Sequence, residues 1–276
     1  MTRRKVFQAI AAGAAIPLAP AAPGSAGRLK QSVCRWCYSK ISLDDLCRNA
    51  ADMGLSGIDL VDENDWPTVR KYGLVPTVTQ GKASIPDGWN RKESHDRLEE
   101  EIRGRIVRAA EAKVPNVITF SGNRKGMSDD EGKANCIAGL SRVKKIAEDH
   151  GVTVVLELLN SKVNHKDYMC DHTAWGVDVV KAVGSPHVKL LYDIYHMQIM
   201  EGDVIHTIKD NFQYIGHYHT GGVPGRHELD DTQELQWRTI AKTIADLKYD
   251  GFFAHEFVPL RDPITSLKEA VVLCTV

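Results

Sequence analysis

Short apolar runs rich in β-branched residues alternate with longer amphipathic stretches from residue 30 onward. Such runs are typical of buried strands, and stretches with apolar residues three or four positions apart are typical of helices. The predicted strands are Gln31–Cys34, Gly57–Val61, Leu74–Thr79, Asn116–Phe120, Thr153–Glu157, Val188–Asp193, Tyr214–His219 and Phe252–Glu256. The predicted helices are Leu43–Met53, Asp65–Tyr72, Ser94–Lys113, Asp129–His150, Ala174–Val183, Asp203–Asp210, Thr232–Leu247 and Ile264–Leu273. The repeating unit is therefore one strand followed by one helix.

Several predicted helices carry local signals at their ends. Ser42 and Ser128 precede acidic first turns, as N-cap residues do, and Gly54 and Gly151 stand where helices should end. Eight strand–helix units without a long linker predict an α/β fold, a single-domain (β/α)₈ TIM barrel over residues 27–276. An open doubly wound sheet is the alternative, but no GxGxxG follows the first strand and the sequence has no P-loop motif.

The composition is that of a folded, mildly acidic protein. A chain of 276 residues with 43% hydrophobic and 26% charged positions is long enough to bury a complete core. The formal charge is -1, and without the three cations among residues 1–26 it is -4. This charge argues against a nucleic-acid partner, because binding to phosphates depends on Lys and Arg. The six cysteines are scattered, and only Cys34 and Cys37 lie close together, so we predict structural burial and leave disulfide pairing open.

The first residues read MTRRKVFQAIAAGAAIPLAPAAPGSAG, with paired arginines, a short apolar run, and then small residues and prolines. This order is typical of a twin-arginine export signal, which we predict for residues 1–26. A glutamine, a glycine and a proline interrupt the apolar run, so we predict no membrane span. The protein is then expected in the periplasm; if the segment is only a tail, the protein is cytoplasmic.

Four consecutive predicted strands, the fifth to the eighth, end in side chains that bind metals. Glu157 closes VTVVLE, Asp193 closes VKLLYD, His219 closes YIGHYH and Glu256 closes FFAHE. The carboxyl ends of barrel strands meet at one mouth, so we expect these four side chains to lie together. Three carboxylates and one imidazole suit Mn²⁺, Mg²⁺ or Co²⁺, with Zn²⁺ as the alternative. We therefore predict one divalent metal ion, whose charge would offset the repulsion between the carboxylates.

Three side chains near these strand ends need a separate interpretation. His217 lies two residues before His219, and we predict a hydrogen-bonded core residue rather than a metal ligand. His255 precedes Glu256 and should face the helices, because successive side chains of a strand point to opposite faces. Trp36 lies near the end of the first predicted strand and is placed to line a sugar pocket with its apolar face.

Four segments resemble the hydroxypyruvate isomerase family of the xylose-isomerase-like barrels. They are ELLN at 157–160, LLYDIYHMQIMEGD at 190–203, IGHYHTGGVPGRHELD at 215–230 and YDGFFAHEF at 249–257. The resemblance implies that Glu157, Asp193 and Glu256 are metal ligands and that His219 occupies the third ligand position. That position is often glutamine in hydroxypyruvate isomerases and is histidine in the related ketose 3-epimerases, so the substrate stays open.

The resemblance also implies substrate contacts and a reaction. His196 and Arg226 would contact the substrate, with Arg226 pairing a carboxylate or hydroxyl groups. A metal that chelates adjacent carbonyl and hydroxyl oxygens acidifies the C–H between them and stabilises the enediolate that follows. Glu157 and Glu256 would be the catalytic residues that take and return the proton. The predicted function is a metal-dependent sugar or keto-acid isomerase that converts hydroxypyruvate to tartronate semialdehyde.

Two alternatives to this isomerase stay open. A ketose or keto-sugar 3-epimerase would use the same residues, and a non-catalytic exported sugar-binding barrel would keep the pocket without the reaction. A DNA-repair endonuclease of the same superfamily, which uses several zinc ions, needs more histidine ligands and a basic face, and neither is apparent in the sequence. The expected partner is a small hydroxy-carbonyl molecule, not nucleic acid or a membrane, and a homo-oligomer stays open.

Overall fold

The computed structural model describes residues 27–79 and 84–276, which form nine strands and ten α-helices. The strands are β1 (Lys30–Cys34), β2 (Gly57–Asp59), β3 (Val75–Pro76), β4 (Val78–Thr79), β5 (Asn116–Thr119), β6 (Thr153–Glu157), β7 (Val188–Asp193), β8 (Ile215–Thr220) and β9 (Phe252–His255). The helices are α1 (Leu43–Asp52), α2 (Trp66–Lys71), α3 (His95–Glu111), α4 (Asp129–Ser141), α5 (Lys144–His150), α6 (Thr173–Val183), α7 (Ile194–Met200), α8 (Val204–Asn211), α9 (Trp237–Asp246) and α10 (Pro263–Cys274). Four 3-10 helices complete the described elements: η1 (Arg35–Tyr38), η2 (Glu63–Asp65), η3 (Lys92–Ser94) and η4 (Phe212–Tyr214).

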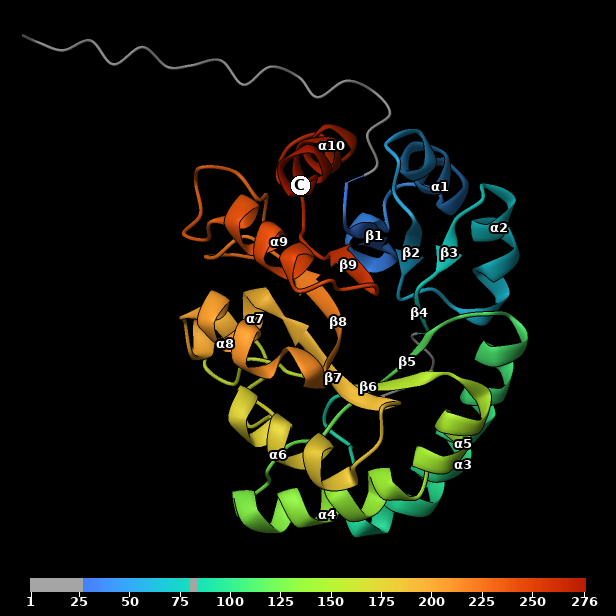
Figure 1. Ribbon diagram of the computed structural model, residues 1–276, viewed down its shortest axis with the longest axis vertical. Coiled ribbons are helices and arrows are strands. Elements are labelled where there is room, and N and C mark those ends of the chain that lie inside the picture. Colours follow the sequence, from blue (N-terminus) through green and yellow to red (C-terminus); the bar gives the residue numbers. More distant parts are fainter. Residues whose placement is uncertain (1–26, 80–83) are drawn as a thin grey trace, which may run out of the picture.

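The strands form one parallel sheet in the order β3-β2-β1-β9-β8-β7-β6-β5-β4. Its two ends, β3 and β4, are parts of one predicted strand and are separated only by Thr77. The backbone N of Thr77 donates to the backbone O of Ile58 at 3.0 Å, and Val61 forms a parallel bridge with Thr79. The strands therefore surround a common axis with the helices outside, which confirms the predicted (β/α)₈ barrel (Figure 1).

Side-chain caps explain where several helices begin. The Ser42 hydroxyl accepts a hydrogen bond from the backbone N of Asp45, and the Ser128 hydroxyl accepts one from the backbone N of Glu131. Both bonds satisfy a backbone donor that a helix leaves free in its first turn. Gly151 ends α5 with a φ of 64°, a left-handed conformation that favours glycine. The predictions made from these three residues are confirmed.

The single helix predicted over Asp129–His150 is wrong, because the chain forms α4 and α5 there. Near the end of α4, the Ser141 hydroxyl donates to the backbone O of Ile137 at 2.7 Å. The backbone N of Arg142 then donates to the backbone O of Gly139 at 3.0 Å, with the spacing of a 3-10 turn. A side chain that bonds its own helix and a tightened last turn both end the regular α-helical ladder.

The helix predicted from Thr232 begins only at Trp237, as α9. The carboxylate of Asp230 accepts a hydrogen bond from the backbone N of Thr232 at 2.9 Å. The side-chain oxygen of Gln233 accepts one from the backbone N of Leu235 at 2.7 Å. These side chains satisfy backbone donors in a turn and so compete with the helix over the first residues of the predicted segment.

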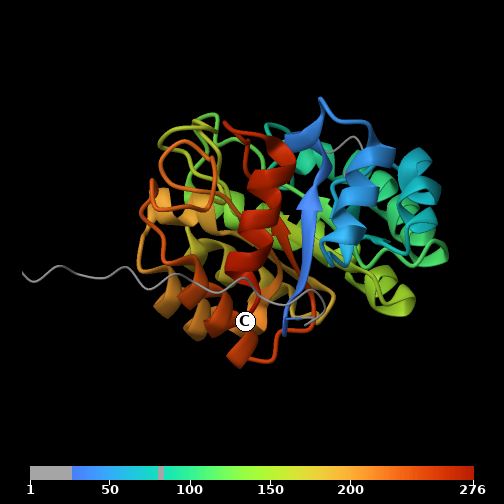
Figure 2. The same ribbon diagram turned by 90° about the horizontal axis from the view of Figure 1, so that it is seen from above.

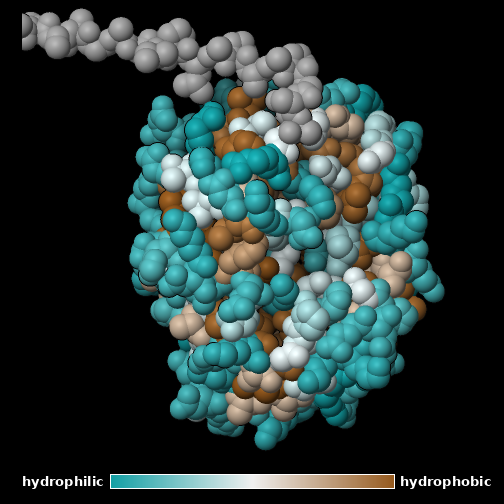
Figure 3. Space-filling model, viewed as in Figure 1, coloured by the Kyte–Doolittle hydropathy of each residue, from teal (hydrophilic) through white to brown (hydrophobic). Residues whose placement is uncertain are grey.

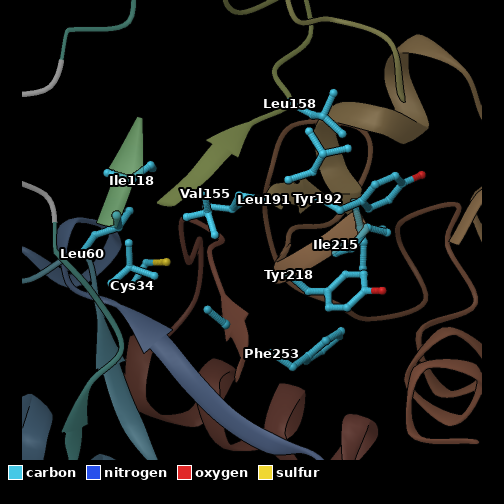
Figure 4. Packing of buried hydrophobic residues seen from close by; sticks show 14 of the residues in the cluster. Cys34, Leu60, Ile118, Val155, Leu158, Leu191, Tyr192, Ile215, Tyr218 and Phe253 are labelled. Carbon is cyan, nitrogen blue, oxygen red and sulfur yellow. The ribbon is translucent and has the colours of Figure 1, made fainter. Parts of the chain in front are cut away.

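The buried hydrophobic side chains form one continuous core. Figure 4 shows Tyr192, Tyr218 and Phe253 projecting from neighbouring strands, and the rings of Tyr192 and Tyr218 meet edge to face with centroids 6.2 Å apart. All six cysteines are free and five of them are buried, in line with the prediction of structural burial. On the face drawn in Figure 3, hydrophilic residues dominate the rim and hydrophobic ones show between the helices.

The predicted export signal, residues 1–26, lies outside the described residues, so the signal, its boundary and the periplasmic location stay predictions. Among the helices of the described ranges, none combines the length and the apolar character that crossing a membrane requires.

In Figure 2 the blue strand β1 points toward one end of the barrel, and in a parallel barrel all carboxyl ends of strands meet at that same end.

Candidate metal centre and active site

The four predicted metal ligands lie at the carboxyl ends of four neighbouring strands. Glu157 and Asp193 are the last residues of β6 and β7, His219 is the next-to-last residue of β8, and Glu256 directly follows β9. Each side chain offers one donor atom, and these four atoms all lie within 4.8 Å of one another. None of the four residues is more than 6% exposed. The structure thus brings all four into one buried cluster.

The register of the strands explains this convergence. Asp193 pairs with His219 across β7 and β8, and Glu157 pairs with Leu191, which lies two residues before Asp193. Residues two apart in a strand share a face of the sheet. Glu157, Asp193 and His219 therefore all project from the inner face of the barrel, with Glu157 one pleat below the others.

Arg226 lies among these carboxylates. Its Nη2 atom is 2.7 Å from Asp193 Oδ2 and also contacts Glu256 Oε2, and its Nε donates to the backbone O of Glu256 at 3.1 Å. The Trp36 indole donates to Glu256 Oε1 at 2.6 Å, and the Arg226 guanidinium lies 5.4 Å from the centre of the Trp36 ring. Two of the predicted substrate contacts thus border the cluster directly.

The carboxylates differ in their electrostatic surroundings. Burial opposes the ionisation of Glu256, but Arg226 and His219 lower the pKa of this carboxyl well below its ordinary value. Burial raises the pKa of Asp193 to about 7, against the lowering effect of Arg226. Burial also raises the pKa of Glu157, and the negative charge of Glu256 adds to this effect. Glu157 is therefore better suited to hold a proton, and Glu256 is held ionised.

His219 provides a test of whether this cluster fits a cation. Its Nδ1 lies 2.6 Å from Glu256 Oε2 and 3.4 Å from Glu157 Oε1. Among the described residues this buried nitrogen has no hydrogen-bond partner, so the short approach lacks the alignment of a hydrogen bond. A cation between these atoms would satisfy the nitrogen and offset the repulsion between the carboxylates. Three carboxylates and one imidazole are donors that Mn²⁺, Mg²⁺ and Co²⁺ accept, so the residues present fit a divalent metal.

His196 belongs to α7, a helix that the sequence pattern does not predict. The Asp193 carboxylate accepts a hydrogen bond from the backbone N of His196 at 3.1 Å and so caps this helix. The His196 ring lies with Nδ1 2.7 Å from Asn160 Nδ2 and Nε2 3.0 Å from Arg226 Nη1. Burial and the charge of Arg226 lower the pKa of His196 well below its ordinary value, so the ring is neutral.

A cavity of about 420 Å³ opens beside the cluster. Its apolar lining residues are Trp36, Leu60, Ile85, Ile118, Phe120 and Leu159. Its polar lining residues are Glu157, His165, His196, Arg226 and Glu256. All three predicted substrate contacts, Trp36, His196 and Arg226, therefore face the same space. A further cavity of about 550 Å³ lies between residues 228–231 and α10, and none of the four predicted ligands lines it.

Sequence reasoning missed three side chains around this site. Asp59 lies in the apolar segment GIDLV, and an acid inside an apolar strand is the signal that could have found it. Asn160 and His165 follow β6 in a loop, where periodicity gives no orientation. His217 is a hydrogen-bonded core residue, as predicted, because its Nε2 lies 2.7 Å from Asp59 Oδ2. His255 lies away from the cluster, and its Nε2 donates to a side chain of β1.

A protein-family model described as xylose isomerase-like TIM barrel matches residues 47–271. The chain belongs to this family. It is 34% identical over 127 residues to 2-oxo-tetronate isomerase of Cupriavidus necator, covering 46% of the chain and 48% of that protein. It is also 34% identical over 119 residues to D-psicose 3-epimerase of Ruminiclostridium cellulolyticum, covering 42% of the chain and 38% of that protein. These alignments span half of either relative or less.

Solved structures share the barrel of this family member. The crystal structure of an AP endonuclease, family 2, from Brucella melitensis superposes with a TM-score of 0.78 at 20% identity, covering 87% of the chain and 97% of that protein. The IOLI protein, whose structure has a binding zinc atom, superposes with a TM-score of 0.66 at 14% identity, covering 89% and 95%. At these identities the likeness supports the fold alone.

Proposed function

We propose that the chain is a metal-dependent isomerase of small hydroxy-carbonyl compounds, with the conversion of hydroxypyruvate to tartronate semialdehyde as its reaction. The observation that carries this proposal is the convergence of Glu157, Asp193, His219 and Glu256 within 4.8 Å beside a cavity. The relatives that share part of the sequence are named as an isomerase and an epimerase, which supports the same class of chemistry.

The four side chains would hold one divalent cation. When bound, such a cation polarises a substrate carbonyl and makes the neighbouring C–H more acidic. Of the two glutamates, Glu157 is the one whose pKa is raised, so its carboxylate is the stronger base and takes the proton. Glu256 is oriented at one oxygen by Trp36 and at the other by Arg226. It would take the proton of the substrate hydroxyl and return it to the adjacent carbon, while the proton on Glu157 passes to the former carbonyl oxygen. One C–H and one O–H bond of the substrate are broken and one of each is formed, both carboxylates end as they began, and no external oxidant or reductant is needed.

Arg226, His196 and Trp36 would orient the substrate. Arg226 lines the cavity, and its Nη1 lies 3.0 Å from His196 Nε2. A guanidinium binds a carboxylate or a pair of hydroxyls through parallel N–H groups, which suits a keto acid or a sugar. Trp36, which is 40% exposed, offers an apolar ring face of the kind that packs against a carbon chain.

A 3-epimerase of ketoses or keto-sugars is the second candidate function. The cavity of about 420 Å³ holds far more than the few heavy atoms of hydroxypyruvate and has room for a larger ketose. Histidine at position 219 also matches the resemblance to the ketose 3-epimerases. Both functions use the same two glutamates, so they differ only in where the proton returns.

Proton NMR in D₂O tests the proposal. The chelator-stripped protein is reconstituted with Mn²⁺, Mg²⁺, Co²⁺ or Zn²⁺ and incubated with hydroxypyruvate, tartronate semialdehyde or common ketoses. Isomerisation moves the carbonyl and epimerisation inverts a neighbouring carbon, whereas both replace a C–H by C–D. Metal-dependent exchange without isomerisation would favour the epimerase. Absence of exchange across the whole panel would contradict both and favour a sugar-binding barrel.

A further inference from the structure

A buried network joins the imidazole of His219 to one carboxylate and a second imidazole. Asp59, the last residue of β2, directs its Oδ2 atom at both rings. This oxygen lies 2.7 Å from Nε2 of His217 and 3.0 Å from Nε2 of His219. All three side chains are 0% exposed. Of these three residues, the function proposed above gives a role only to His219.

The Asp59 carboxylate accepts hydrogen bonds at both of its oxygens. Its Oδ1 accepts one from the Thr77 hydroxyl at 2.7 Å and one from the backbone N of Leu60 at 3.2 Å. Two donors already meet Oδ1, and both imidazoles approach Oδ2 at hydrogen-bond distance, so a carboxylate that accepts all four bonds needs the hydrogen on Nε2 of each histidine.

This arrangement determines which nitrogen of His219 is available. A metal binds only the neutral imidazole, which carries one hydrogen, so a ring with that hydrogen on Nε2 presents the lone pair of Nδ1. Nδ1 is the nitrogen that lies 2.6 Å from Glu256 Oε2 and 3.4 Å from Glu157 Oε1. The opposite tautomer would direct an N–H at these carboxylates and leave no lone pair for a metal there.

We propose that Asp59 is a positioning residue that holds His219 with its hydrogen on Nε2 and directs Nδ1 into the metal site. This inference rests on the metal-dependent function proposed above and extends it to a residue outside the four ligands. His217 donates a hydrogen bond to the same carboxylate oxygen and so helps to fix the orientation of the Asp59 carboxylate. A hydrogen bond to the distal nitrogen of a ligating histidine fixes its tautomer and raises its basicity, with effects of roughly 10–100-fold on metal affinity.

The position of Cys34 suggests a different interpretation of this network, as a second metal site. Its Sγ lies 3.8 Å from Asp59 Oδ2 and 3.9 Å from His219 Nε2, so these three groups together form a second candidate cation site. The separations of 2.7 and 3.0 Å between the imidazole nitrogens and Asp59 Oδ2 are those of ordinary N–H···O hydrogen bonds. A cation there would have to displace those hydrogens. The two interpretations predict one and two metal ions per chain, respectively.

Calorimetric titration of the chelator-stripped full chain with Mn²⁺ tests the proposal. Asp59→Asn should raise the Kd for Mn²⁺ roughly 10–100-fold, because the amide loses the charge and must turn its NH₂ either toward both Nε2–H groups or toward the backbone N–H of Leu60. The matched control is Gln31→Leu, which removes the buried hydrogen bond from His255 Nε2 at 2.8 Å. It should leave the Kd within about twofold, because it acts on a hydrogen bond that is not part of the cluster.

A second measurement reads the tautomer in the wild-type protein and uses a variant only to assign the signals. Nitrogen NMR of the histidine rings in the Mg²⁺-loaded wild-type protein reports which ring nitrogen carries hydrogen. We expect Nε2–H for both His217 and His219, with the signals assigned by comparison with His217→Gln. A His219 ring protonated on Nδ1 alone would overturn the proposal.

The outcomes separate the positioning role from the metal site itself. An unchanged Kd in Asp59→Asn, with wild-type binding intact, overturns the role of Asp59 and leaves the metal site in place. Two equivalents of Mn²⁺ in the wild type, falling to one in Cys34→Ser, overturn it in favour of the second cation site. If the wild type binds no divalent metal, the proposed function itself fails, and the positioning role fails with it.

Discussion

Glu157 and Glu256 are the same residue type in the same cluster, yet their neighbours make them different acids. Glu256 accepts hydrogen bonds from Trp36 and Arg226. Among the described residues, the Glu157 carboxylate has one charged contact, His219 Nδ1 at 3.4 Å. Burial and the charge of Glu256 raise the pKa of Glu157, whereas, against the effect of burial, Arg226 and His219 lower that of Glu256. A pair with separated pKa values is what proton removal from one carbon and return to another requires.

Substitution of either glutamate should greatly slow proton transfer. We expect Glu157→Gln or Glu256→Gln to slow substrate C–H exchange with D₂O by more than the ~10²–10⁴-fold of one acid–base group, because each change also removes a metal ligand. Proton NMR of the substrate measures the rate. Glu234→Gln, at an exposed position, is the control and should exchange at the wild-type rate. Wild-type exchange in either site variant would refute the assignment.

Binding of the metal should depend on pH through Asp193. Burial raises the pKa of this carboxyl to about 7, and a metal binds only its ionised form. The protonated fraction grows as the pH falls below about 7, which alone raises the Kd for Mn²⁺ about tenfold between pH 8 and pH 6. His219 adds to this rise, because, against the effect of burial, Glu256 raises its pKa and the ring must lose a proton to bind a metal. Calorimetry at several pH values measures this change. A Kd that stays constant, or falls, toward pH 6 would contradict the expected ionisation of Asp193.

At the scale of elements, close packing of neighbouring strands places Asp59 under His219. Gly57 lies two residues before Asp59, and a Cβ at Gly57 would come within 2.4 Å of the backbone O of Val75 and 2.5 Å of Thr77 Cγ2. Both atoms belong to the segment that closes the barrel. The approach of β2 to β3 therefore requires glycine at this position.

Gly57→Ala should destabilise the barrel by about 1–3 kcal/mol, the usual effect of overpacking, because backbone of β3 must move. Gly104→Ala is the matched control: it makes the same change in α3, where a Cβ would meet only the flexible Arg108 side chain within 4 Å. This control should stabilise the protein by about 0.8–1 kcal/mol, since alanine is the better helix former. Denaturant unfolding measures both free energies. Equal effects of the two substitutions would contradict the close approach at Gly57.

At the scale of the whole molecule, the cluster gathers three carboxylates and one imidazole from the ends of four strands. Glu157, Asp193 and Glu256 are buried together, and Arg226 supplies a positive charge among them. Like charges in one buried site oppose folding unless cations offset them. A divalent cation bound in this cluster, as proposed, should therefore stabilise the barrel.

Addition of metal should raise the thermal stability of the chelator-stripped protein. At a free metal concentration of 100 Kd the expected gain is about 2.7 kcal/mol. For a chain of this size such a gain raises Tm by roughly 5–10 °C. Scanning calorimetry with and without Mn²⁺ measures the shift, and Asp193→Asn, which removes a ligand, should reduce it. An identical Tm with and without metal would contradict binding to the folded state.

The pattern of apolar and polar residues in the sequence was sufficient to predict the barrel architecture and the four side chains at the ends of strands. Alternating apolar runs and amphipathic stretches predict the strands and most helices, because these periods reflect local backbone geometry. Glu157, Asp193, His219 and Glu256 were predictable because parallel strands of a barrel share one mouth. Ser141 and Asp230 changed helix ends through local side-chain bonds that periodicity does not register.

Only the tertiary structure decided which groups surround those four. Asp59 and His219 are 160 positions apart, and nothing local to either segment shows that one carboxylate oxygen meets two imidazoles. The contact of Arg226 with Asp193 and Glu256 likewise depends on a loop folding over the mouth. Periodicity determines which face a side chain takes, but closure of the barrel determines which distant faces meet. The tautomer of His219 and the unequal acidities of the two glutamates follow from that closure.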